Sequence, residues 1–87
     1  MRNITEISNI IIKLKKANEI EQFFGEIFTQ NELETLSKRW RILNMLKEGK
    51  TQRAIAQELN VSLCKVTRAA KILKNKNAII RNILIKD

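Results

Sequence analysis

The side chains best suited to bind a ligand lie between Lys50 and Lys76, where seven basic residues accompany a single acid, Glu58. Ammonium, guanidinium and amide groups are the donors that bind phosphate oxygens and base edges. The whole chain holds 17 Lys plus Arg against 9 Asp plus Glu, for a net charge of +8, yet residues 1–49 contribute only +1 of it. This concentration favours a polyanion as the partner over a uniformly solvated basic surface.

The stretch from Thr51 to Lys74 is predicted to form two short helices joined by a tight turn. Asn60 tolerates the left-handed conformation that a sharp turn needs, and the hydroxyl of Ser62 can cap the second helix. The inward contacts of the two helices are assigned at helical spacing to Ile55, Ala56 and Leu59, and then to Val61, Val66 and Ala69 or Ala70. This is the pattern of a helix-turn-helix, whose second helix enters the major groove of DNA.

The second helix, Ser62 to Lys74, is therefore the predicted recognition helix. Lys65 lies in its first turn, where the helix dipole disfavours a cation and a polyanion would remove the conflict. A helix pair that binds nothing is the structural alternative. The predicted DNA contacts are Gln52, Arg53, Ser62, Leu63, Cys64, Lys65, Thr67, Arg68 and Lys71.

Composition argues against several other classes of protein. The chain has no His and one cysteine, Cys64, so we expect no metal site, no intrachain disulfide and a reduced, cytoplasmic protein. The absence of a Gly-rich phosphate loop and of a plausible acid–base pair argues against an enzyme. No secretion signal or membrane span is recognisable, although a basic amphipathic first helix at a membrane surface is an alternative interpretation.

Eighty-seven residues without Pro predict one small all-α domain of six helices. Its expected parts are dimerisation helices in residues 1–49, the helix-turn-helix in residues 50–74 and a C-terminal helix in residues 75–87. A chain this short has a limited hydrophobic core per subunit, which favours burial of its apolar side chains against a second copy in a homodimer. The other predicted helices run from Asn3 to Lys16, from Asn18 onward, from Gln30 to Glu48, and from Ala78 to about Ile85.

Capping signals set these boundaries. Asn18 with Glu21 and Thr29 with Glu32 have capping-box spacing, and Asn77 can cap the last helix. Gly49 is suited to end the long helix, which carries a broad apolar face and is predicted to be central. That face comprises Leu33, Leu36, Trp40, Leu43 and Leu46, with Ile42 and Met45 beside it.

The order of these elements resembles the Trp repressor superfamily over about Phe23 to Lys74. The matching motifs are Thr29-x-x-Glu32, Lys38-Arg39-Trp40-Arg41-Ile42, Leu46-Lys47-Glu48-Gly49, Thr51-Gln52-Arg53, Glu58-Leu59, Val61-Ser62, Val66-Thr67-Arg68 and Leu73-Lys74. The resemblance implies an intertwined homodimer that represses transcription from a palindromic double-stranded DNA operator.

The resemblance also implies an L-tryptophan corepressor held by Thr29, Arg39, Arg68 and Ala69. Arg39 would stack on the indole, and Arg68 would pair with the carboxylate. Tryptophan-binding members have Gly at the position of Ala69 and a polar residue at that of Ile72. These departures leave DNA binding intact and leave open a ligand-independent regulator, or a basic interaction module without sequence-specific DNA binding.

Overall fold

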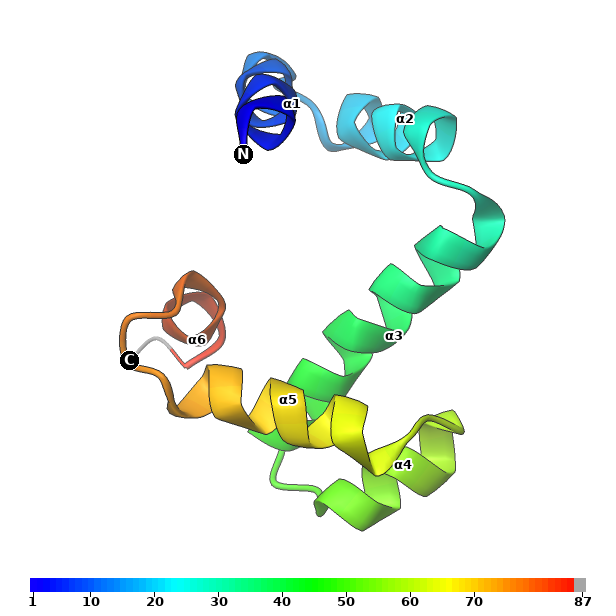
Figure 1. Ribbon diagram of the computed structural model, residues 1–87, viewed down its shortest axis with the longest axis vertical. Coiled ribbons are helices and arrows are strands. Elements are labelled where there is room, and N and C mark those ends of the chain that lie inside the picture. Colours follow the sequence, from blue (N-terminus) through cyan, green and yellow to red (C-terminus); the bar gives the residue numbers. More distant parts are fainter. Residues whose placement is uncertain (86–87) are drawn as a thin grey trace. The chain divides into compact units, whose positions relative to one another are not determined.

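The computed structural model describes residues 1–85, and these residues form six helices and no strand (Figure 1). The helices are α1 (Arg2–Lys13), α2 (Ala17–Ile27), α3 (Gln30–Lys47), α4 (Gln52–Leu59), α5 (Leu63–Lys74) and α6 (Ile79–Leu84). The predicted all-α class and helix count are therefore confirmed. The chain divides into two compact units, residues 1–34 and the part from Thr35 onward. Residues 86–87, the end of the predicted C-terminal segment, lie outside the described residues.

The first unit holds α1 and α2, neither of which has a buried residue. The prediction that Asn18 caps α2 is wrong. Lys16 already occupies the N-cap position in an extended conformation, and its carbonyl accepts hydrogen bonds from the N–H groups of Glu19 and Ile20. Asn18 consequently lies inside the first turn. The aromatic side chains of α2 interact with one another, since the ring of Phe24 lies 6.3 Å from that of Phe23.

The start of α3 has the predicted capping box. The Thr29 N–H donates to Glu32 Oε1 at 2.8 Å, and the Glu32 N–H donates to Thr29 Oγ1 at 3.2 Å. The two bonds satisfy backbone donors that a helix N-terminus leaves without partners.

The second unit contains the hydrophobic core, built where the C-terminal half of α3 meets α4, α5 and α6. Trp40 and Leu36, which belong to the predicted apolar face of α3, are exposed in the single chain, Trp40 at 47%. The apolar stripe of α3 thus continues beyond the part that enters this core. The core side chains are Ile42, Leu43, Met45, Ile55, Leu59, Val66, Ala69 and Leu84.

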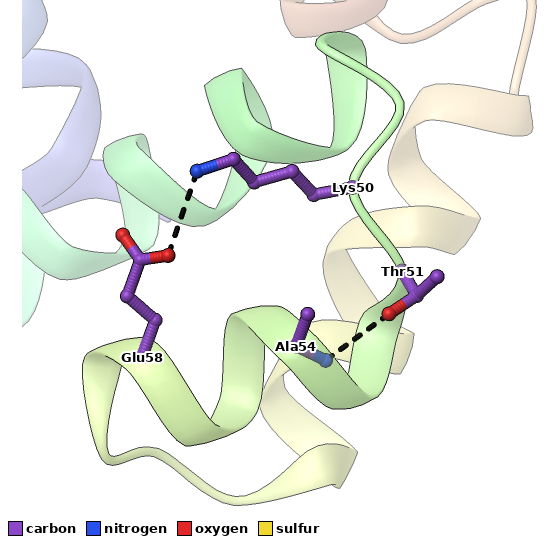
Figure 2. A network of polar contacts seen from close by, with 4 residues as sticks. All are labelled: Lys50, Thr51, Ala54 and Glu58. Carbon is purple, nitrogen blue, oxygen red and sulfur yellow. Dashed lines mark hydrogen bonds and ion pairs between the residues drawn. The ribbon is translucent and has the colours of Figure 1, made fainter.

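The turn from α3 to α4 is closed by the backbone. Gly49 adopts a φ of +92°, its N–H donates to the Leu46 carbonyl, and the Lys50 N–H donates to the Met45 carbonyl. This pair of backbone hydrogen bonds is the Schellman motif. Figure 2 shows the next contacts: Thr51 Oγ1 accepts from the Ala54 N–H at 3.2 Å, and Lys50 Nζ lies 3.5 Å from Glu58 Oε1. The predicted role of Gly49 is confirmed, and Thr51 is the N-cap of α4.

Replacing Gly49 by Ala should lower the free energy of unfolding by about 1 kcal/mol. A Cβ there meets no atom within 4 Å, so the cost comes from the left-handed backbone alone. Gly49→Asn is the control at the same position, because Asn tolerates this conformation better. Urea denaturation at equal protein concentration measures both, and equal stability of Gly49→Ala and the parent would contradict the assignment.

The last helix begins differently from the prediction. Asn77 does not cap α6, because its own N–H donates to Asn75 Oδ1 and Ala78 takes the N-cap position without a side-chain bond. No helix within residues 1–85 is long and apolar enough to cross a membrane.

Candidate nucleic-acid interface

Two buried side chains fix the helix-turn-helix from within. Ile55 of α4 and Val66 of α5 are both 0% exposed. Between the helices, Asn60 adopts the predicted left-handed conformation with a φ of 54°, and the Val61 N–H reaches back to the Ala56 carbonyl. Ser62 Oγ then accepts from the Lys65 N–H at 3.4 Å and caps α5. The sequence thus predicted this turn residue by residue.

The outward side of α5 combines basic and apolar side chains. Ser62, Leu63, Cys64 and Lys65 are all exposed at the start of the helix, with Leu63 at 46%. An open groove runs along the helix and is lined by Leu63, Cys64, Thr67, Arg68, Lys71, Ile72 and Asn75. Five of the nine predicted DNA contacts therefore lie together along one groove.

The predicted contacts on α4 lie in its first turn. Arg53 is exposed, whereas Gln52 is half-buried and bonded to α5: Thr67 Oγ1 donates to Gln52 Oε1 at 2.9 Å. This bond joins residues 15 positions apart in the sequence. No local pattern in the sequence could have indicated it, because it depends on how α4 and α5 cross.

The cations of this surface are not neutralised internally. Within residues 1–85 the ion pairs are Arg2–Glu6 and Lys50–Glu58. Consequently Arg53, Lys65, Arg68 and Lys71 have no acidic partner among the described residues. Unpaired exposed cations on two adjoining helices, Arg53 on α4 and the other three on α5, are the electrostatic pattern expected of a surface that binds nucleic-acid phosphates.

The four residues suggested for a corepressor have different environments. Thr29 caps α3, and Arg39 is exposed on the same helix. Arg68 and the apolar Ile72 both line the groove of α5. Ala69 is only 7% exposed and belongs to the hydrophobic core.

Residues 1–85 contain no cluster of three or more His, Cys, Asp or Glu side chains that could bind a metal ion.

Comparison with known proteins agrees with this arrangement. The family model of the Trp repressor protein matches residues 2–87. A Trp operon repressor homolog of Xylella fastidiosa (strain M23) is 35% identical over 69 residues, covering 78% of this chain and 75% of the relative. The uncharacterized protein YerC of Bacillus subtilis (strain 168) is 30% identical over 76 residues, covering 87% of this chain and 73% of the relative.

A Trp operon repressor homolog of Chlamydia trachomatis serovar L2 (strain ATCC VR-902B / DSM 19102 / 434/Bu) is 29% identical over 76 residues, covering 86% of this chain and 81% of the relative. No solved structure matches the chain significantly. The family match extends over almost the whole chain, including both helices of the helix-turn-helix. The chain therefore belongs to the Trp repressor family.

Proposed function

We propose that this protein is a DNA-binding transcriptional repressor of the Trp repressor type, which binds a palindromic operator as a homodimer. The observation that carries the proposal is the outward side of α5. Its cations lack acidic partners among the described residues, while its inward side is anchored in the core. Such a helix can enter a major groove without leaving its own packing. The family and the relatives named as Trp operon repressor homologs support the same regulatory function rather than an enzymatic one.

Roles follow from the chemistry of the exposed groups. Arg53 and Lys65 suit phosphate oxygens, which fix the protein's position on the duplex. Ser62, Leu63 and Cys64 lie at the start of α5, where residues of a recognition helix reach base edges. Leu63, with its exposed apolar side chain, suits contact with a thymine methyl group.

The exposed apolar side chains support the homodimer. Ile79 and Ile83 of α6 are 75% and 62% exposed, and the isoleucine-rich α1 has no buried residue. Patches of this kind on a small protein mark interaction surfaces. Covering them with a second copy gives a self-complementary interface, with one recognition helix on each side of its two-fold axis.

Sedimentation equilibrium should therefore report a dimer at micromolar concentration. Interfaces of obligate dimers commonly exceed about 2,000 Å², enough to keep the copies together at that concentration. Ile79→Glu/Ile83→Glu should shift the equilibrium toward monomer, because it places four carboxylates in the interface of two copies. A parent protein that sediments as a folded monomer would contradict the proposal.

A ligand-independent regulator is the second candidate, and the surroundings of Arg68 favour it. Ala69 adds a methyl group where tryptophan-binding members have Gly, and Ile72 offers no polar partner to a ligand ammonium. Leaving that ammonium without a partner costs about 1–3 kcal/mol, or roughly 10- to 150-fold in affinity. We therefore expect measurable operator binding without tryptophan.

Selection of bound duplexes from a random pool tests the proposal. The dialysed protein is used with and without millimolar L-tryptophan. Both selections should enrich one palindrome whose half-sites lie about 34 Å apart, the separation of successive major grooves. Enrichment only with tryptophan would refute ligand independence but not DNA binding. Failure to enrich any sequence in either arm would refute sequence-specific operator binding.

A further inference from the structure

We propose that Thr67 is a positioning residue that acts on DNA through Gln52. In this arrangement the Thr67 hydroxyl holds the Gln52 side chain so that its amide NH₂ donates to a DNA phosphate. The inference rests on the proposed DNA-binding function. The sequence analysis predicted both Gln52 and Thr67 as DNA contacts, whereas here the two residues have different roles. Gln52 touches the DNA, and Thr67 orients Gln52.

The hydroxyl hydrogen of Thr67 is already used in a hydrogen bond within the protein. A threonine hydroxyl has one hydrogen, and that of Thr67 is donated to Gln52 Oε1 across 2.9 Å. While this bond exists, the same hydroxyl cannot donate to a phosphate. A carboxamide has two further hydrogens on its nitrogen. Those of Gln52 form no hydrogen bond with any described residue, so they remain available for a phosphate oxygen.

The bond between Thr67 and Gln52 also restrains the Gln52 side chain. Gln52 begins α4, whereas Thr67 lies on α5, the helix whose Val66 is anchored in the core. Both side chains are half-buried, so the contact is partly shielded from water. A glutamine side chain has three rotatable bonds, and ordering it only on binding would weaken affinity. The bond to Thr67 supplies that order in advance.

The bonded pair lies next to cations on both helices. Gln52 is adjacent to Arg53, an exposed cation, and Thr67 is adjacent to Arg68 in the lining of the α5 groove. The bonded pair therefore connects the cationic start of α4 to the cationic side of α5. A neutral donor fixed between these cations contributes geometry to phosphate binding without contributing charge. Its loss should weaken binding without changing the number of released counterions.

A double-mutant cycle on a fluorescein-labelled duplex of mixed sequence tests the inference, because phosphate contacts act on any sequence. The variants are Thr67→Val, Gln52→Leu and the double variant. Thr67→Val should weaken binding about 2- to 10-fold, and Gln52→Leu at least as much, which is the scale of a lost hydrogen bond. The double variant should bind no more weakly than Gln52→Leu alone, since Thr67 then has nothing to orient. Thr67→Ser retains the hydroxyl and should restore parental affinity.

Two further measurements separate positioning from a merely structural role. The slope of log affinity against log salt should be unchanged in Thr67→Val, Thr67→Ser, Gln52→Leu and the double variant, because none of these changes adds or removes a charge. Gln52→Glu keeps an acceptor for the Thr67 hydroxyl but loses the NH₂ and adds a negative charge. It should therefore fold like the parent and bind DNA at least about 10-fold more weakly. This variant keeps the inference testable if Thr67→Val does not fold.

Some outcomes overturn this inference alone. Losses that multiply in the double variant would show that Thr67 contacts DNA independently, and unchanged affinity in Gln52→Glu would show that its NH₂ makes no contact. In both cases the parent still binds the duplex, so the proposed function survives. A parent protein that fails to bind the duplex even at low salt would instead overturn the proposed function and this inference together.

Discussion

Replacing Arg53 and Lys65 together by alanine is expected to weaken DNA binding on the order of 100-fold. Each cation is exposed, has no acidic partner among the described residues, and is proposed to contact one phosphate. A hydrogen bond to a charged group contributes about 1.5–3 kcal/mol, so each loss costs roughly 10-fold or more. The salt slope should fall by roughly 1 for each lost phosphate contact.

Fluorescence anisotropy between about 50 and 200 mM salt measures affinity and slope for each single variant and for the double variant. Lys38→Ala is the matched control, since it removes an exposed cation from α3, outside the predicted contacts. The control should change neither affinity nor slope by as much as Arg53→Ala or Lys65→Ala. If both single variants keep the parental affinity and slope, the assignment of these two cations is wrong.

Ile55→Ala should be the most destabilising of the conservative changes in the helix-turn-helix, lowering the free energy of unfolding by about 2–5 kcal/mol. Ile55 is 0% exposed and belongs to the core that unites α3, α4, α5 and α6, so truncation leaves a cavity between them. Because domains of this size are stable by only about 5–15 kcal/mol, the loss should strongly raise the unfolded fraction.

Urea denaturation followed by circular dichroism checks this expectation at a fixed protein concentration, which matters if the folded state is a dimer. Ile55→Val is the graded control, because removing one methylene group typically costs about 0.5–1.5 kcal/mol. A smaller loss for Ile55→Ala than for Ile55→Val would show that the side chain is not enclosed as described.

The parts of the fold that were predictable from the sequence are those with local causes. Thr29 with Glu32, Gly49, Asn60 and Ser62 each act on backbone within a few residues, and each has its predicted role. The prediction for Asn18 was wrong because the capping position is set by where the backbone leaves its extended conformation, which here is Lys16. Residue type alone does not specify that point.

Burial and long-range contacts were less predictable. Trp40 has the helical spacing of its buried neighbours, yet the core that α3 shares with α4, α5 and α6 begins at Ile42 and does not include it. For the site, the charge distribution predicted the basic surface of α5, because charge is a property of composition. The bond between Gln52 and Thr67 required the crossing of two helices to be known.

Titration of the ¹⁵N-labelled protein with the duplex recovered from the random pool, followed by nuclear magnetic resonance, tests whether α4 and α5 form the DNA-binding surface. The largest amide shifts should occur at Gln52, Arg53 and residues 62–68, with much smaller shifts in α6. Largest shifts in α6, with those of Arg53 and Lys65 unchanged, would contradict the claim that α4 and α5 form the DNA-binding surface.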